Sequence, residues 1–218
     1  MKYNVAIDGP AGAGKSTIAK LLADRLGLMY INTGSMYRAV TMVALENHIM
    51  ENDNEELQKI IHNMNIEFSG DNLILNGEDI QDKITTPYIS NNVSKYAANR
   101  VVREKLVKLQ QDIAMKSSVV MDGRDIGTVV LKDAEYKFFL TASPEERARR
   151  RFNELVSKKL QVCFEEILED IIKRDNYDTT REIDPLKMAE DAIKIDSTGK
   201  SIEDVIDTMI GVINKTNK

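Results

Sequence analysis

The stretch Gly9-Pro-Ala-Gly-Ala-Gly-Lys15-Ser16 constrains the fold of this chain more than any other. A short apolar run with the character of a buried strand precedes it, and apolar residues at helical spacing follow it as far as Leu26. A glycine-rich loop of this spacing between a strand and a helix is typical of a phosphate-binding loop. Glycines let backbone N–H groups turn towards an anion, and the helix N-terminus adds partial positive charge. The sequence therefore predicts that the chain binds a nucleoside triphosphate.

We expect the residues of this loop to have different roles in nucleotide binding. Lys15 adds a full positive charge beside the phosphates, and the hydroxyl of Ser16 is placed to ligate Mg²⁺. We expect the nucleotide to contact a continuous run, namely Gly9, Pro10, Ala11, Gly12, Ala13, Gly14, Lys15, Ser16 and Thr17.

Strand and helix patterns alternate along most of the chain. The expected strands after the loop are residues 28–31, 119–122, 137–140 and 192–196. Helical spacing lies between them, with an expected break near Asn99. Such alternation predicts an α/β fold in which helices cover both faces of a parallel sheet. From Ile66 to Ile80 the period changes to two and turn residues separate the runs, which predicts a small antiparallel excursion.

The composition describes an ordinary globular protein that fits one domain. The net charge of −5 over 218 residues argues against a broad nucleic-acid-binding surface. No apolar run approaches the roughly 20 residues of a membrane span, and no signal-peptide core follows Met1. A single cysteine, Cys163, excludes an internal disulfide framework. We therefore expect a cytoplasmic protein without a nucleic-acid or membrane partner.

A second group of charged residues follows the strand at 119–122. The carboxyl ends of parallel strands face the ligand crevice, so Asp122, Arg124 and Asp125 are expected near the bound phosphates. An apolar strand that ends in aspartate is also the pattern of a Mg²⁺-holding residue, which makes Asp122 a metal candidate beside Ser16.

Two more basic segments come later in the chain. The first, Glu146-Arg-Ala-Arg-Arg-Arg151, is either a solvated helix face or an arginine-rich flap that excludes water from a phosphoryl-transfer site. In the second, Asp178 and Arg181 lie three residues apart. They could serve a sugar hydroxyl and a phosphate, or form only a surface salt bridge.

Five segments together resemble the bacterial cytidylate kinases. They are Ile7-Asp-Gly-Pro-Ala-Gly-Ala-Gly-Lys-Ser16, Thr33-Gly-Ser-Met-Tyr-Arg38, Asp122-Gly-Arg-Asp-Ile-Gly-Thr128, Arg174-Asp-x-x-Asp178-x-x-Arg181 and Asp196-Ser-Thr198. They occur in the order of the family and cover nearly the whole chain. The resemblance implies a P-loop kinase that transfers a phosphoryl group from ATP, with Mg²⁺, to CMP or dCMP.

The resemblance also implies roles for individual residues. The cytosine contacts would be Ser94, Arg103 and Asp125. The monophosphate clamp would be Arg38, Arg124 and Arg181, with Thr33 beside it, and Asp178 would contact the ribose. Charge on the transferring group would be neutralised by Lys15, Arg124, Arg181 and the lid arginines, among them Arg149 and Arg151.

The same resemblance divides the single kinase domain into three parts. The core would comprise residues 1–33, 100–148 and 166–218. A monophosphate-binding region with the antiparallel insert would span about 34–99, and a short helical lid about 149–165. We expect a monomer whose partners are small nucleotides.

Two other functions use the same loop. A GTP-binding switch would carry an Asn-Lys-x-Asp motif, which the sequence lacks, and Asp196-Ser-Thr-Gly199 comes too late in the chain to serve as its Asp-x-x-Gly. A kinase of the same fold that acts on an alcohol, such as shikimate or gluconate, would need to deprotonate a hydroxyl group. This chain instead offers enough arginines for a second phosphate. For Asp125, the alternative to base recognition is a pair with Arg124 or the support of a loop.

Overall fold

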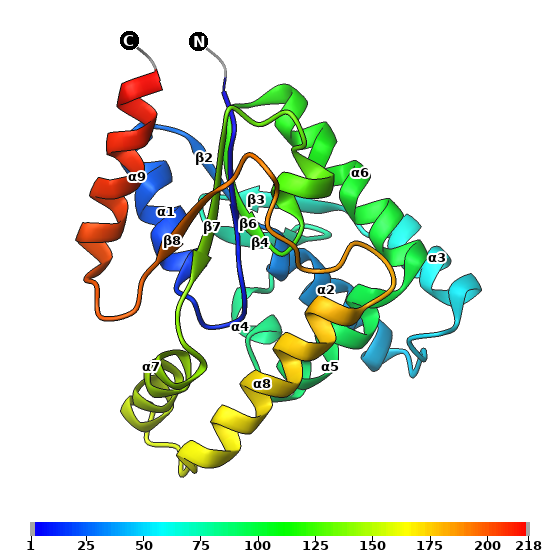
Figure 1. The fold of residues 1–218 in the computed structure, drawn as a ribbon. Helices are drawn as coiled ribbons and strands as arrows, with labels where there is room; N and C mark the ends of the chain where they lie inside the picture. The colour runs from blue at the N-terminus through cyan, green and yellow to red at the C-terminus, as the bar shows by residue number, and fades with distance from the viewer. Residues whose placement is uncertain (1–2, 217–218) are drawn as a thin grey trace.

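A five-stranded parallel sheet forms the centre of the molecule, as the alternation predicts (Figure 1). The computed structural model describes residues 3–216. The sheet runs in the order β2 (Met29–Asn32), β6 (Val119–Gly123), β1 (Val5–Asp8), β7 (Tyr136–Thr141) and β8 (Ile193–Asp196). Strand β1 is central: Val5 pairs with Val120 on one side and with Tyr136 on the other. All four residues of β1 are buried, which explains why its sequence is almost entirely apolar.

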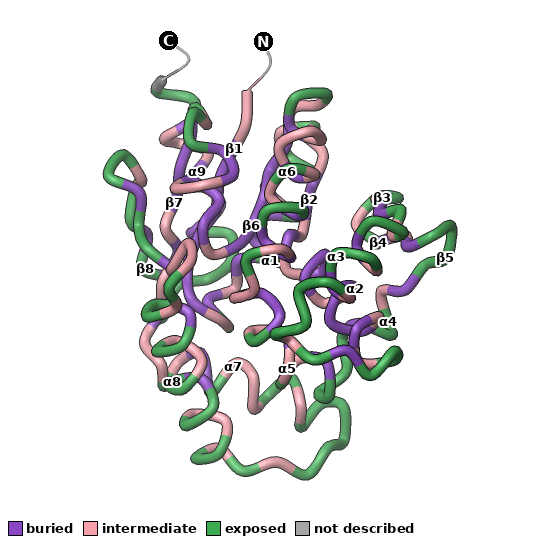
Figure 2. Tube along the Cα trace, turned by 90° about the vertical axis from the view of Figure 1, so that its right-hand side faces the viewer, coloured by how far each residue is buried: buried purple, intermediate pink, exposed green. Residues whose placement is uncertain are grey.

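Helices cover the two faces of this sheet. Val5 and Ile7 pack with α1 (Lys15–Leu26) and α9 (Ile202–Thr216), whereas Ala6 packs with α2 (Thr33–Glu46) and α6 (Arg100–Lys116). This division follows from the strand geometry, because successive side chains point to opposite faces. Figure 2 shows the consequence, with buried chain concentrated along the sheet and on the inner sides of the helices.

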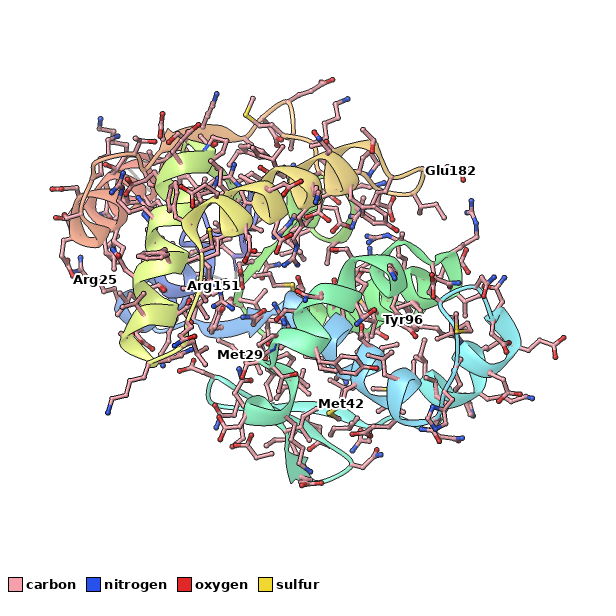
Figure 3. The ribbon with its side chains drawn as sticks, turned by 90° about the horizontal axis from the view of Figure 1, so that it is seen from below. Arg25, Met29, Met42, Tyr96, Arg151 and Glu182 are labelled. Carbon is pink, nitrogen blue, oxygen red and sulfur yellow. The ribbon has the colours of Figure 1, made fainter. Side chains whose placement is uncertain are left out.

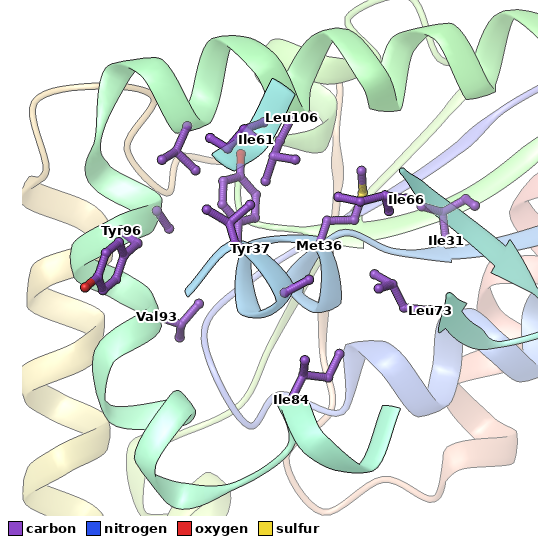
Figure 4. Close-up of a cluster of buried hydrophobic side chains, with 14 of the residues drawn as sticks. Ile31, Met36, Tyr37, Ile61, Ile66, Leu73, Ile84, Val93, Tyr96 and Leu106 are labelled. Carbon is purple, nitrogen blue, oxygen red and sulfur yellow. The ribbon is translucent and has the colours of Figure 1, made fainter. Parts of the chain in front are cut away.

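A further group of elements lies between α2 and α6 in the sequence. It contains α3 (Asn54–His62), β3 (Ile66–Ser69), β4 (Asn72–Leu75), β5 (Glu78–Asp79), α4 (Gln81–Ile84) and α5 (Pro87–Ala98). The three strands form a small antiparallel sheet in which Ile66 pairs with Leu75, so the predicted excursion is confirmed. Ile66 and Leu73 pack against Met36 of α2 in the larger hydrophobic cluster (Figure 4).

The predicted helix break falls at Asn99. Helix α5 ends there, and the Asn99 side chain accepts a hydrogen bond from Val102 N at 3.2 Å, which caps α6. Helices α5 and α6 are therefore joined by a single residue, Asn99.

Two helices extend beyond the carboxyl ends of the strands (Figure 1). Helix α7 (Pro144–Ser157) is capped by Ser143, which accepts from Glu146 N at 3.2 Å, and α8 (Phe164–Thr180) follows after a short connection. The rings of Phe152 and Phe164 meet edge to face at 6.2 Å and join the two helices near the connection. Across residues 3–216, none of the helices has the length and apolar character needed to cross a membrane.

Candidate active site

The loop from Gly9 to Gly14 joins β1 to α1, so the predicted strand–loop–helix context is confirmed. Gly9 has φ 147°, and a Cβ atom there would lie 1.9 Å from the carbonyl oxygen of Leu140, so only glycine fits. Helix α1 begins at Lys15, whose side chain is buried and donates from Nζ to the Pro10 carbonyl at 2.7 Å. Burial lowers the pKa of Lys15, and the nearby Arg124 guanidinium lowers it further. Phosphate oxygens bound at this loop would favour the charged ammonium.

Ser16 and Asp122 meet at this loop, as the metal prediction requires. Ser16 Oγ donates to Asp122 Oδ2 at 3.0 Å, and the Tyr30 hydroxyl holds the other carboxylate oxygen at 2.9 Å. Burial raises the pKa of Asp122, while the Lys15 charge acts in the opposite direction. No group of three or more histidine, cysteine, aspartate or glutamate side chains in residues 3–216 could hold a metal ion. A hydroxyl and one carboxylate fit Mg²⁺, which is commonly bound by one or two carboxylates together with substrate phosphates and water.

Arginine side chains gather beside the loop with too few carboxylates to balance them. Arg124 donates from Nε to Asp178 Oδ2 at 2.8 Å, and Arg38 donates to Ser90 Oγ at 2.7 Å. Burial lowers the pKa of Arg38, and its neighbours Arg124 and Arg151 lower it further. These guanidinium groups are partly desolvated and repel one another, and an anion bound between them would relieve this repulsion.

Arg174 belongs to this basic group, although the sequence assigned it no role. Its Nε atom is buried without a hydrogen-bond partner and lies 4.0 Å from Asp178 Oδ2. Burial and the charge of Arg124 lower its pKa to about 10. Its spacing of four residues from Asp178 on α8 was the available signal, because residues at that spacing share a helix face. Asp178 itself is buried, which favours a site residue over the surface salt bridge.

A second polar cluster lies where α6, the end of β6 and the end of α8 meet. Arg103 is only 1% exposed, and its guanidinium donates to Asp125 Oδ2, to Asp184 Oδ2 at 2.7 Å and to the Ala97 carbonyl at 3.1 Å. Arg181 Nη2 lies 3.7 Å from the other oxygen of Asp125. Asp125 therefore pairs with Arg103 and Arg181 rather than with Arg124. Burial raises the pKa of Asp125, and the two arginines oppose that shift.

An aromatic ring lies against the Arg103 guanidinium. The Arg103 guanidinium lies over the ring of Tyr37, 5.6 Å from its centroid, and the buried Tyr37 hydroxyl has no hydrogen-bond partner. Thr33 Oγ1 donates to the Asp122 carbonyl at 2.7 Å and so ties the start of α2 to the end of β6. Ser94 is half-buried on α5.

The arginines of α7 divide into different surroundings. Arg149 is exposed and lies over the Phe164 ring at 5.9 Å. Arg150 donates to the Ser197 carbonyl at 2.8 Å, and Arg151 pairs with Glu154 at 2.7 Å. Figure 3, seen from below, places Arg151 of α7 and Tyr96 of α5 on opposite sides of the centre of the view. The charge of Arg151 lowers the pKa of Arg38.

Arg147 is the buried member of the same helix, and sequence reasoning assigned it no separate role. Its guanidinium binds Asp175 of α8 through two hydrogen bonds of 3.1 and 2.6 Å. It also donates to the Ala142 carbonyl and to the Ala11 carbonyl of the loop, each at 3.0 Å. One side chain thus connects α7, α8 and the phosphate-binding loop.

Asp8 connects the loop with the residues that follow β6. Its carboxylate accepts from Ile126 N and from Gly127 N, both at 2.7 Å. These N–H groups open η1 (Ile126–Val130), a single wide helical turn directly after Asp125. Burial raises the pKa of Asp8 to about 7 despite the two backbone donors.

The fold and the glycine-rich loop between β1 and α1, together with the family match below, define the class of this protein as a P-loop kinase. The structure of shikimate kinase from Bacteroides thetaiotaomicron matches it with a TM-score of 0.52 at 15% identity, over 98% of this chain and 99% of that one, which shows a shared fold. The family model described as cytidylate kinase matches residues 5–215. Curated cytidylate kinases from Clostridium perfringens and Clostridium botulinum are 60% and 55% identical to it, over 97% and 99% of both chains respectively. The chain belongs to the cytidylate kinase family.

Proposed function

We propose that this protein transfers the γ-phosphoryl group of ATP to CMP or dCMP and releases ADP with CDP or dCDP. The observation that carries the proposal is the placement of two unlike sites at one edge of the sheet. One is the phosphate-binding loop at the end of β1, and the other is the arginine group at the end of β6 with the Arg103–Asp125 cluster beside it. Membership of the cytidylate kinase family supports the same reaction.

Phosphoryl transfer needs alignment and cancellation of charge more than covalent help. An oxygen of the CMP phosphate attacks the γ-phosphorus, and the bond from that phosphorus to the oxygen bridging to the β-phosphate breaks. The attacking oxygen is already anionic, so no general base is required. Holding both phosphates in line supplies a positional effect of up to roughly 7–11 kcal/mol.

The charged residues would share the electrostatic part of catalysis. Lys15 would bind the phosphates of ATP, and Arg38, Arg124 and Arg181, with Thr33 nearby, would hold the monophosphate. Arg174 joins this clamp in our proposal, because its unpartnered Nε is buried among the same groups. Arg149 and Arg151 would approach the transferring group from α7.

Ser16 and Asp122 would hold Mg²⁺ against the phosphates of ATP. When bound, the ion neutralises charge on the phosphate oxygens and fixes their orientation.

The base would be recognised by the Arg103–Asp125 cluster. Cytosine presents an N4 amino donor next to its N3 and O2 acceptors, whereas uracil presents an O4 acceptor next to an N3–H donor. Asp125 would accept from N4, and Arg103 would donate to N3 or O2, with Ser94 as the third contact. Asp178 would contact the ribose.

The protein would act as a cytoplasmic monomer with three parts. Residues 34–99 would form the monophosphate-binding region, and residues 149–165 would form the lid. The lid would comprise the second half of α7, the connection and the start of α8. The remaining residues, 1–33, 100–148 and 166–218, would form the core; of these, residues 1–2 and 217–218 lie outside the described part of the chain.

An acceptor panel tests the proposal. ADP release from ATP is measured with CMP, dCMP, UMP, AMP, shikimate and gluconate, each at matched concentrations. We expect CMP and dCMP to be the best acceptors. A larger kcat/KM for an alcohol or for AMP would overturn the proposal.

Replacement of Asp125 by alanine tests how the base is read. A buried polar site typically rejects the mismatched analogue by about a hundredfold or more. We expect Asp125→Ala to reduce kcat/KM for CMP far more than for UMP, so that their ratio narrows by roughly tenfold. Equal losses for both substrates would mean that Asp125 only supports the structure.

A further inference from the structure

Asp184, in the segment between α8 and β8, contacts the Arg103–Asp125 cluster. Its Oδ2 accepts from Arg103 Nε at 2.7 Å, and its main-chain carbonyl accepts from Arg181 Nε at 2.8 Å. Its backbone has φ 46°, in the left-handed region that aspartate tolerates better than most residues. A single residue of this segment therefore contacts both arginines that flank Asp125.

The donors of Arg103 are divided among three acceptors. A guanidinium is planar, and its Nε and Nη2 atoms share the edge through which arginine binds a carboxylate side-on with two hydrogen bonds. In this protein Nε donates to Asp184 while Nη2 donates to Asp125, and Nη1 donates to the Ala97 carbonyl. Two carboxylates thus share the edge that one carboxylate could otherwise occupy alone.

Because of this division, the Oδ1 atom of Asp125 accepts no hydrogen bond from Arg103. Arg103 contacts only its Oδ2 atom, and the Nη2 of Arg181 remains 3.7 Å from Oδ1, longer than a hydrogen bond. The formal charges of Arg103, Arg181, Asp125 and Asp184 sum to zero. Without the Asp184 carboxylate, two guanidinium groups would compete for one carboxylate and draw both of its oxygens into pairing.

We propose that Asp184 is a positioning residue for recognition of the pyrimidine base. It holds Nε of Arg103, restricts the Arg103–Asp125 contact to one nitrogen, and so keeps Oδ1 of Asp125 available to accept from the exocyclic amino group of the base. This inference rests on the proposed function, because it assigns a role in reading cytosine at the same site.

Two substitutions separate the carboxylate from the backbone. Asp184→Gly removes the side chain and keeps the positive φ, and it leaves the carbonyl that holds Arg181. Asp184→Asn keeps one acceptor oxygen, removes the charge and replaces the other oxygen with an NH2 donor. His48→Gly is the matched control, because His48 is exposed, has φ 57° and follows the end of α2.

The experiment measures kcat and KM for CMP and UMP at saturating ATP, and KM for ATP at saturating CMP, with thermal unfolding of each variant. We expect kcat/KM for CMP to fall about tenfold in Asp184→Gly, mostly through KM, and by about threefold in Asp184→Asn. The values for UMP and the KM for ATP should stay within about twofold of the parent, as should all values of the control.

Three results would overturn the inference. These are unchanged CMP kinetics in both variants, equal losses for CMP and UMP, or a parallel rise in KM for ATP, which would indicate a general structural role. If Asp184→Gly does not fold, the kinetics of Asp184→Asn with CMP and UMP test the inference in its place. Failure of the proposed function is distinguishable, because the parent protein would then not phosphorylate CMP, and that result overturns this inference as well.

Discussion

The buried contact of Arg147 yields a stability prediction that can be worked from the structure. Arg147→Met removes a guanidinium that is 3% exposed and donates four hydrogen bonds, two of them to Asp175. Loss of one partner of a buried ion pair typically costs 3–5 kcal/mol, because the other charge stays buried without compensation. The Asp175 side chain is 22% exposed and can recover some hydration. We therefore expect a loss near the lower end, about 3 kcal/mol in the free energy of unfolding.

Urea unfolding of the parent and the variant measures this loss, and α7 supplies a matched control. Arg151→Met makes the same substitution on the same helix, but its ion pair with Glu154 has side chains that are 38% and 45% exposed. Such a pair contributes less than about 1 kcal/mol. A double-mutant cycle of Arg147→Met with Asp175→Asn should then show losses that are clearly less than additive. Equal losses for Arg147→Met and Arg151→Met would refute the reasoning.

Three further predictions concern catalysis, pH and motion. Lys15→Met should leave the fold intact but lower kcat by about a hundredfold or more, and an unchanged kcat at saturating nucleotides would exclude its role. The pKa of Asp8 is about 7 in the folded protein and 3.8 in the unfolded chain. The free energy of unfolding of the parent should therefore fall relative to that of Asp8→Asn as the pH rises from 3.8 to 7, by at most about 4 kcal/mol. Above pH 7 the difference between the two proteins should be constant. Denaturant unfolding from pH 4 to pH 8 checks this, and a pH-independent difference would contradict it. Hydrogen exchange in residues 149–165 should slow strongly when a bisubstrate analogue binds, whereas unaltered exchange would count against a lid.

The sequence predicted the parts of the fold that depend on local pattern. The loop at Gly9–Ser16, the change of period at Ile66 and the helix break at Asn99 all carry signals within a few residues, and the structure confirms each. The parallel sheet followed from the alternation of strands and helices. The meeting of Ser16 with Asp122 followed from the rule that strand ends share one edge of such a sheet.

The contacts that sequence reasoning missed join distant parts of the chain. Arg147 reaches the Ala11 carbonyl across 136 positions, and Asp184 reaches Arg103 across 81. No spacing rule relates such residues, and in the sequence Arg147 is one of several similar arginines in a charged helix. In the sequence, Asp8 is only the residue before the first glycine of the loop. The two backbone N–H groups that donate to it belong to η1, a turn that no pattern in the sequence predicts.

The most direct test of the proposed reaction follows the transferred group itself. The protein is incubated with CMP, Mg²⁺ and ATP labelled in the γ-phosphate, and the products are separated by chromatography. We predict that the label appears in the β-phosphate of CDP, with one ADP formed for each CDP. Label found only in inorganic phosphate, with CMP unchanged, would contradict the proposed function.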